Sequence, residues 1–226
     1  MSVRIGMITV GQSPRVDVVP DMREILGPAV AIVERGALDG LDGATIASLA
    51  PRPGQEMLVT RLAGGGSVFV AKDHVVARVQ ACVDALEGAG VEVNVLLCTG
   101  AFPPFRASRP LVEPQQVLLG VLRGLVCPGR LGVLTPSVPH VPQTEARWRA
   151  DGFDPLVIPL SPYEESDPAA VSRAADALHA GGAGVVVMDC IGFRRKTRAE
   201  LQHRLGVPVL VANLLVARVV AEIAGL

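Results

Sequence analysis

Two similar segments, one in each half of the chain, run an apolar strand into a cysteine that is followed two residues later by glycine. The segments are residues 93–102, with Cys98 and Gly100, and residues 185–193, with Cys190 and Gly192. Short apolar runs rich in β-branched residues are typical of parallel strands buried on both faces. Because ligands bind beyond the carboxyl ends of such strands, either cysteine is a candidate for chemistry; the alternative is a thiol that only packs.

Hydrophobic periodicity predicts strands and helices that alternate along both halves. Strands are predicted at residues 3–10, 29–34, 93–97, 130–135, 153–159, 185–188 and 207–211. Helices are predicted at residues 17–27, 44–49, 73–87, 114–126, 141–150, 168–179, 197–205 and 212–223. A β-hairpin is predicted from residues 56–61 and 67–71, which flank a glycine triplet.

This order predicts an α/β fold of two pseudo-symmetric lobes with a cleft between them. Each lobe is expected to be a mostly parallel sheet flanked by helices, because each cysteine strand follows a helix. We assign residues 1–126, with Cys98, to the first lobe and residues 127–226, with Cys190, to the second. The last helix is also able to pack back on the first lobe.

Composition narrows the class of protein. Half of the residues are apolar, which allows a substantial core, and the net charge of −1 gives no general basic surface for nucleic acid. We expect no membrane segment, because no apolar run reaches about 18 residues, and no signal peptide. Four cysteines without a close pairing pattern suit reduced thiols, so a cytoplasmic location is expected. The four histidines lack metal-ligand spacing, and no metal site is expected.

The turn after the first strand is a candidate anion site. Ser13 before Pro14 predicts a helix N-cap followed by proline at the first helical position. Free N–H groups at such a helix start can hold a carboxylate or phosphate. The candidate residues are Gly11, Gln12, Ser13 and Arg15. The alternative is that Ser13 only caps the helix. Further arginines in loops at strand ends, either anion ligands or solvated charges, are Arg106, Arg109, Arg194 and Arg195.

Two thiols on opposite sides of one cleft can catalyse proton transfer at the α-carbon of a carboxylate. One, as thiolate, takes a proton from the α-carbon, and the other returns a proton from the opposite face. Thr99 can hydrogen-bond a thiolate or a substrate carboxylate, and Asp189 either opposes a thiolate at Cys190 or orients a loop N–H or a substrate amine. Other candidates beside the strand ends, for substrate binding or for proton transfer, are Gly100, Thr135, His140, Ile191 and Gly192.

Four motifs carry a family resemblance. They are Thr9-Val-Gly-Gln-Ser-Pro-Arg-Val-Asp17, Gly36-Ala-Leu-Asp-Gly40, Met188-Asp-Cys-Ile-Gly-Phe193 and Pro208-Val-Leu-Val-Ala-Asn-Leu-Leu-Val-Ala-Arg218. By these motifs the chain resembles the AroM family over nearly its whole length. That family lies within the broader aspartate/glutamate (and hydantoin) racemase-like superfamily. The family name implies an association with aromatic amino-acid genes rather than a particular reaction.

The superfamily resemblance implies cofactor-independent racemase, isomerase or decarboxylase chemistry on small carboxylates. It places Cys98 and Cys190 in the catalytic pair. The chain departs from the racemase pattern at the residue after each cysteine. Thr99-Gly100 stands where a polar pair such as Asn-Thr is usual, and Ile191 stands where threonine is common. Compared with the racemase pattern, the chain therefore lacks the second hydroxyl, next to Cys190, that would bind a substrate carboxylate.

Two functions remain open at the level of sequence. The first is an isomerase or racemase acting on a small carboxylate without a cofactor. The second is a small-anion-binding or regulatory protein on a racemase scaffold, linked to aromatic amino-acid metabolism. A homo-oligomer is a further candidate, because apolar residues in 117–122 and 214–220 suit either a dimer face or the core.

Overall fold

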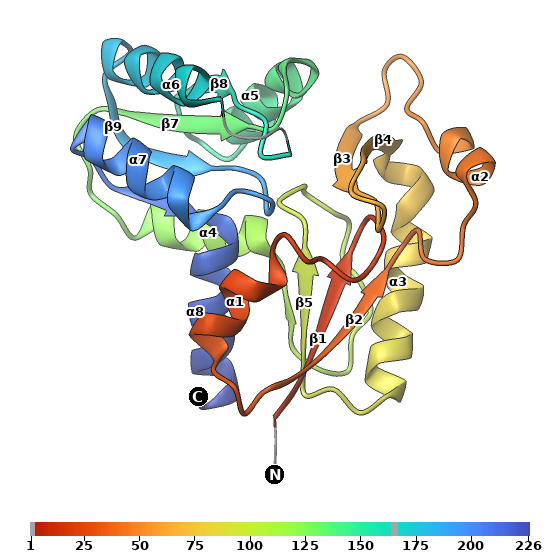
Figure 1. The fold of residues 1–226 in the computed structure, drawn as a ribbon. Helices are drawn as coiled ribbons and strands as arrows, with labels where there is room; N and C mark the ends of the chain where they lie inside the picture. Colours follow the sequence, from red (N-terminus) through yellow and green to blue (C-terminus); the bar gives the residue numbers. More distant parts are fainter. Residues whose placement is uncertain (1–2, 164–166) are drawn as a thin grey trace. The chain divides into compact units, whose positions relative to one another are not determined.

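The computed structural model describes residues 3–163 and 167–226 (Figure 1). The chain divides into two compact units. Unit 1 runs through Gln116 and includes Val216–Leu226, whereas unit 2 is Val117–Leu215. The divisions fall inside helices α4 (Pro114–Arg123) and α8 (Ala212–Ala224), so each of these helices contributes to both units. The predicted division after residue 126 lies further along the chain.

Unit 1 is built on a parallel sheet with strand order β2-β1-β5-β6. Its strands are β1 (Arg4–Thr9), β2 (Ala31–Gly36), β5 (Val93–Leu97) and β6 (Leu111–Val112). Its helices are α1 (Val19–Leu26), α2 (Gly43–Ser48) and α3 (Lys72–Gly88). The predicted hairpin is confirmed as β3 (Met57–Arg61) and β4 (Ser67–Ala71). Right-handed crossovers place α1 and α3 on opposite faces of the sheet, as Figure 1 shows.

Helix α3 covers β1 with the apolar stripe that its periodicity predicts. Val75, Val79, Val83 and Leu86 are fully buried. Cys82 lies on the same face, and burial raises the pKa of its thiol to about 11, which suits a packing role.

Unit 2 repeats this plan with strand order β10-β9-β7-β8. Its strands are β7 (Arg130–Thr135), β8 (Pro155–Pro159), β9 (Ala183–Met188) and β10 (Val209–Val211). Its other elements are the 3-10 turn η1 (Val138–His140) and helices α5 (Val141–Ala150), α6 (Pro168–Ala180) and α7 (Arg195–Leu205). Crossover handedness puts α5 on one face of the sheet and α6 and α7, which contact each other, on the other.

The first strands of the two units share a sequence pattern. Strand β1 reads Arg-Ile-Gly-Met-Ile-Thr and β7 reads Arg-Leu-Gly-Val-Leu-Thr. A Cβ on Gly6 would lie 2.9 Å from Leu86 Cδ1, and one on Gly132 would lie 2.7 Å from Leu178 Cδ2. Each glycine therefore lets a helix, α3 or α6, approach its sheet closely.

The predicted N-cap at Ser13 is wrong. Helix α1 begins at Val19, and Pro20 rather than Pro14 occupies its first turn. Ser13 directs both its N–H and its hydroxyl to Asp39, at 2.8 and 2.6 Å. The residues before α1 thus form a loop that is fixed by a neighbouring loop.

The apolar segments considered for a dimer face are largely buried within the single chain. Their buried residues are Leu118, Leu119, Leu122, Leu214, Val216, Ala217 and Val220. Across the described ranges, none of the helices has the length and hydropathy needed to span a membrane.

Candidate functional site

Each cysteine of interest follows the third strand of its sheet, beside the first strand. Cys98 comes directly after β5 and Cys190 two residues after β9. In both sheets the strand order reverses between the first and third strands, and ligands bind at such switch points beyond the carboxyl ends. The fold therefore places both cysteines at positions suited to ligand binding.

Asp189 anchors the end of β9 to helix α5. Its Oδ2 accepts hydrogen bonds from Arg147 Nη2 at 2.5 Å and from Trp148 Nε1 at 2.8 Å. The Asp189 side chain is fully buried, and no residue of the described ranges hydrogen-bonds its other oxygen, Oδ1. The Arg147 guanidinium also lies 5.7 Å from the centre of the Trp148 ring. The carboxylate is thus paired inside the protein, where its charge is offset by Arg147.

Cys190 is only 5 % exposed and lies beside a tyrosine. Tyr163 Oη is 3.6 Å from Cys190 Sγ, within hydrogen-bond range for sulfur. A Cβ on Gly192 would lie 2.9 Å from Cε1 of the Tyr163 ring. Glycine at position 192 therefore leaves the space that the tyrosine ring occupies.

Asn213 fixes the loop that follows Cys190. Its buried Nδ2 donates to the carbonyl oxygens of Ile191 at 2.9 Å and of Phe193 at 2.7 Å. Two of the family-like motifs, at 188–193 and 208–218, therefore meet through one side chain. This contact holds the backbone next to the thiol in one conformation.

Cys98 packs against the apolar core of unit 1. It is half-buried, and Phe102 packs against the same core. Gly100 N donates to Cys98 Sγ at 3.4 Å, and a Cβ on Gly100 would lie 2.9 Å from Leu58 Cδ2. Thr99 between them is buried.

The loop after β1 is tied to two neighbouring segments. Gln12 Oε1 accepts from Ala63 N at 3.0 Å, and its Nε2 donates to Leu38 O at 3.4 Å. Asp39 also accepts from Gly36 N at 2.7 Å, in addition to both Ser13 bonds. A Cβ on Gly11 would lie 2.2 Å from the carbonyl oxygen of Arg61. The family-like motifs at 9–17 and 36–40 are thus joined by hydrogen bonds that hold the loop after β1 in place.

Arg15 is buried in an ion pair. Its Nε and Nη2 donate to the two Asp17 oxygens at 2.8 and 2.9 Å, and Nη1 donates to Thr9 Oγ1 at 3.0 Å. Burial opposes ionisation of Asp17, but the Arg15 hydrogen bonds and charge hold the pKa of that carboxyl below its usual value. The guanidinium of Arg15, one of the predicted anion ligands, therefore binds an internal carboxylate.

The candidate residues at and after the end of β7, Thr135 and His140, also form hydrogen bonds within the protein. Thr135 Oγ1 and Thr144 Oγ1 share a buried hydrogen bond of 2.9 Å. His140 is buried in η1, where its Nδ1 lies 2.8 Å from Ser137 Oγ. These contacts position the segment that links β7 to α5.

Glu113 is a titratable residue that the sequence analysis did not select. It follows β6 directly, and burial raises the pKa of its carboxyl. The β5–β6 pairing of Val95 with Val112 places it at the carboxyl edge of the sheet that carries Cys98. A Glu-Pro pair between a strand and a helix is the signal that could have identified it.

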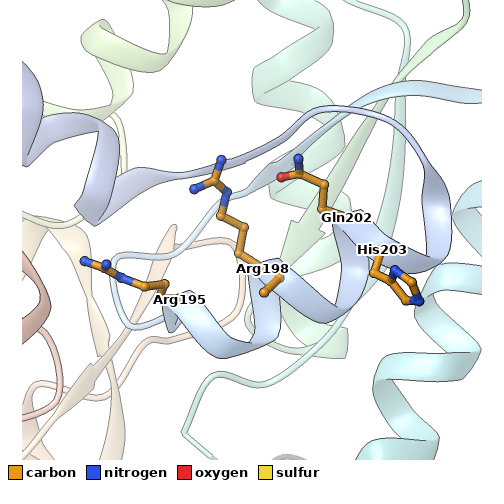
Figure 2. Close-up of a pocket in the computed structure, with 5 residues that line it drawn as sticks. Arg195, Arg198, Gln202 and His203 are labelled. Carbon is orange, nitrogen blue, oxygen red and sulfur yellow. The ribbon is translucent and has the colours of Figure 1, made fainter.

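A basic depression lies on helix α7. Its volume is about 530 Å³, and its lining residues are Arg195, Arg198, Ala199, Gln202 and His203. Figure 2 shows Arg198 and Gln202 on the same side of the helix, with His203 directed away from them. Arg198 Nε donates to Val209 O at 3.0 Å, which fixes one wall. Of the predicted anion ligands, Arg195 lies here.

The structure gathers the predicted residues into separate groups. Asp189, Cys190, Ile191 and Gly192 share the end of β9, and Thr99 and Gly100 follow Cys98 in the other unit. Their roles in catalysis and substrate binding stay predictions. Five residues that hydrogen-bond predicted site residues were not identified from the sequence: Asp39, Arg147, Trp148, Tyr163 and Asn213. Only Asp39 and Asn213 carried a signal, because both lie within the quoted motifs.

Comparison with known proteins gives a family and a fold. A family model described as AroM protein matches residues 5–224. No curated protein sequence matches the chain. Allantoin racemase from Klebsiella pneumoniae is 19 % identical, covers 99 % of this chain and 88 % of its own, and gives a TM-score of 0.61.

Two further solved structures have the same fold. Picrophilus torridus aspartate racemase is 12 % identical, with 99 % of this chain and 94 % of its own covered and a TM-score of 0.62. Nocardia farcinica maleate cis-trans isomerase is 18 % identical, with 99 % and 93 % covered and a TM-score of 0.66. A mutant of that isomerase is solved with a covalently bound succinylcysteine intermediate. At these identities the similarity establishes the racemase-like fold.

Proposed function

This chain belongs to the AroM family, and we propose that it is a cofactor-independent racemase- or isomerase-like enzyme acting on a small carboxylate. The observation that carries the proposal is the matching position of Cys98 and Cys190, each after the third strand of a four-stranded parallel sheet. The racemase-like fold and the cysteine adduct of the maleate isomerase support cysteine chemistry on this fold.

In the proposed reaction, a cysteine thiolate removes a proton from one carbon and a cysteine thiol returns a proton to the same carbon. One cysteine, as thiolate, takes the proton from the α-carbon and becomes a thiol, which leaves a carbanion stabilised by the carboxylate. The other thiol protonates the opposite face of that carbon and becomes a thiolate. One proton leaves and one returns, so the step consumes no oxidant, reductant or cofactor.

The surrounding residues have two kinds of role in this proposal. The Thr99 hydroxyl and the backbone N–H groups of Ile191 and Gly192 are the candidate ligands of the substrate carboxylate. Gln12, Ser13, Arg15, Thr135 and Asp189 have polar contacts within the protein. We propose that these residues shape the strand ends rather than bind the substrate directly.

Exchange of the α-proton with solvent deuterium tests the proposal. The panel would include aspartate, glutamate and other small carboxylates that carry an α-hydrogen, and each would be followed by NMR with the parent, Cys98→Ser and Cys190→Ser. We expect exchange or isomerisation of one compound and a loss of at least about a hundredfold in each variant. Cys127→Ser, a thiol outside the proposed site, is the matched control and keeps the parent rate. Equal exchange in all four proteins rejects the two-thiol mechanism.

The α7 depression favours a second candidate function, which is binding of a small anion without turnover. Two arginines and a histidine line it, and Ile191 supplies no hydroxyl beside Cys190. Titration calorimetry with shikimate and small dicarboxylates would test it. We expect saturable binding that Arg195→Gln weakens and that Cys98→Ser and Cys190→Ser leave unchanged. Binding that depends on the cysteines instead supports the enzyme.

A further inference from the structure

We propose that Tyr163 is a positioning residue for Cys190, whose hydroxyl donates a hydrogen bond to the sulfur when the thiol ionises. The inference deepens the proposed function and rests on it for its catalytic meaning, although the contact itself is testable without a substrate. Tyr163 Oη lies 3.6 Å from Cys190 Sγ. With a neutral thiol, either group can be the donor.

The tyrosine ring occupies the space left by Gly192, two residues after the cysteine. A Cβ at position 192 would lie 2.9 Å from Tyr163 Cε1, 3.2 Å from Cζ and 3.3 Å from Oη. The hydroxyl end of the ring therefore lies against the Gly192 backbone. Asn213 fixes the same loop by bonding the carbonyl oxygens on both sides of Gly192. The loop and the ring together define the position of the phenol oxygen relative to the sulfur.

The electrostatics of this end of β9 make a hydroxyl donor important. Cys190 is 5 % exposed, so water contributes little to stabilising a thiolate there. The adjacent Asp189 carboxylate is paired with Arg147 and Trp148. The tyrosine hydroxyl is ordinarily the weaker acid, with a pKa near 10 against about 8.5 for a thiol. The proton thus stays on the phenol oxygen when the sulfur ionises, and the phenol acts as the donor.

The same cysteine-x-glycine pattern has a different neighbour in unit 1. A Cβ on Gly100 would meet Leu58 Cδ2 at 2.9 Å and Phe102 Cε2 at 3.4 Å. Both neighbours are apolar, whereas the neighbour of Gly192 carries a hydroxyl. The tyrosine contact is therefore a specific feature of Cys190 and not a consequence of the pattern. This difference gives the two thiols of the proposed reaction different environments.

Tyr163→Phe tests the inference, because it keeps the ring and removes only the donor. Iodoacetamide alkylation of each cysteine would be followed by peptide mass spectrometry from about pH 5 to about pH 10. We expect the midpoint of the Cys190 profile to rise by about one pH unit, since a hydrogen bond to a charged group is lost. The thiolate fraction near pH 7 then falls about tenfold, while the more basic thiolate reacts about threefold faster.

The expected profiles therefore cross. In Tyr163→Phe the Cys190 rate is about threefold lower near neutral pH and about threefold higher on the alkaline plateau. Profiles of Cys98 and Cys127 in the same samples stay unchanged and serve as internal controls. Superimposed Cys190 profiles, rates that change by one factor at every pH, or no Cys190 reaction in the parent would each overturn the proposal.

Gly192→Ala gives a second, independent variant. Its Cβ displaces the Tyr163 ring, so we expect the same rise of the midpoint, and circular dichroism checks that the protein is folded. A midpoint equal to that of the parent in a folded Gly192→Ala protein contradicts the inference. The assay uses no substrate, so failure of the deuterium exchange rejects the enzyme while leaving this result intact. Conversely, an unchanged profile rejects only the role of Tyr163.

Discussion

At the scale of single residues, Asp189 is the strongest candidate for a structural role beside Cys190. Its fully buried carboxylate receives the Arg147 and Trp148 donors. We expect Asp189→Ala to lower the free energy of unfolding by about 4 kcal/mol, because it removes the buried carboxylate to which Arg147 and Trp148 both donate. Urea denaturation measures this change directly.

The matched control is a second aspartate–arginine pair in the same unit. Asp154 binds Arg130 at 2.8 Å, but its side chain is 72 % exposed. Solvent screening reduces such a pair to at most about 1 kcal/mol, so Asp154→Ala should be nearly neutral. Equal losses in the two variants would contradict the role assigned to Asp189.

The positions of the residues around Cys190 could be predicted from the sequence, but the partners of Asp189 and Arg15 could not. The strand end and its cysteine are local features, so residues 185–193 predicted both. The partners of Asp189 come from α5, about forty positions earlier in the chain, and no local pattern reports such a contact. Arg15 shows the same limit, because a basic residue in a loop gives no sign that Asp17, two residues later, will pair with it.

At the scale of elements, the loop between β1 and α1 should respond to acid through Asp17. Its carboxyl pKa is lower in the folded protein than the ordinary 3.8. As the pH falls, the unfolded chain therefore binds a proton at Asp17 more readily than the folded protein does. The stabilisation that the Asp17–Arg15 pair provides is fully present above about pH 4 and is lost as the pH falls through the folded pKa. We expect Asp17→Asn to cost about 3 kcal/mol near pH 7, with the difference from the parent shrinking toward pH 3.

Urea midpoints between about pH 7 and about pH 3 would measure this dependence. Asp21→Asn is the control, because Asp21 lies in the first turn of α1 and forms no ion pair among the described residues, so this variant should keep the slope of the parent. An Asp17→Asn protein that loses stability as steeply as the parent would show that this pair does not titrate.

The loop that follows β1 packs closely against the end of β3 in the hairpin, where Gly11 lies beside the backbone of Arg61. Gly11→Ala would place its Cβ 2.2 Å from the Arg61 carbonyl oxygen, a backbone atom that cannot rotate away. We expect a loss of about 3 kcal/mol in thermal or urea unfolding, at the upper end of the cost of overpacking. Gly120→Ala is the control: nothing lies within 4 Å of its Cβ, and it should stabilise α4 by about 0.5 to 1 kcal/mol. A Gly11→Ala protein as stable as the parent would reject the close packing at Gly11.

Elements with a clear apolar pattern or turn signal were predicted well, whereas the shortest strand and the start of α1 were not. Helix α3 and strand β7 match their expected ranges closely, because each carries a clear apolar pattern. Strand β6 has only two residues and was missed, since two residues show no periodicity. The start of α1 was displaced because a serine–proline pair resembles a cap locally, while Asp39 in another loop determines what Ser13 binds.

At the scale of the whole molecule, the repeated strand order explains why one cysteine strand occurs in each half. The Arg-x-Gly-x-x-Thr pattern of β1 and β7 begins two sheets of the same order, and each third strand leads to a cysteine. This duplication was readable because each copy is encoded locally. The sequence left open where the last helix packs, because an apolar stripe does not specify its partner.

The final prediction concerns that last helix. Val216, Ala217 and Val220 are fully buried and belong to unit 1, although they lie about a hundred residues beyond its main segment. Burying two valine side chains contributes about 3 to 6 kcal/mol, a large share of the 5 to 15 kcal/mol that is typical of a domain. A fragment of residues 1–126 should therefore show much faster amide hydrogen exchange in β1 and β5 than the full chain. Adding a peptide of residues 212–226 should restore part of that protection, since it supplies the missing apolar face. Full protection in the fragment alone would show that unit 1 is stable without the final helix.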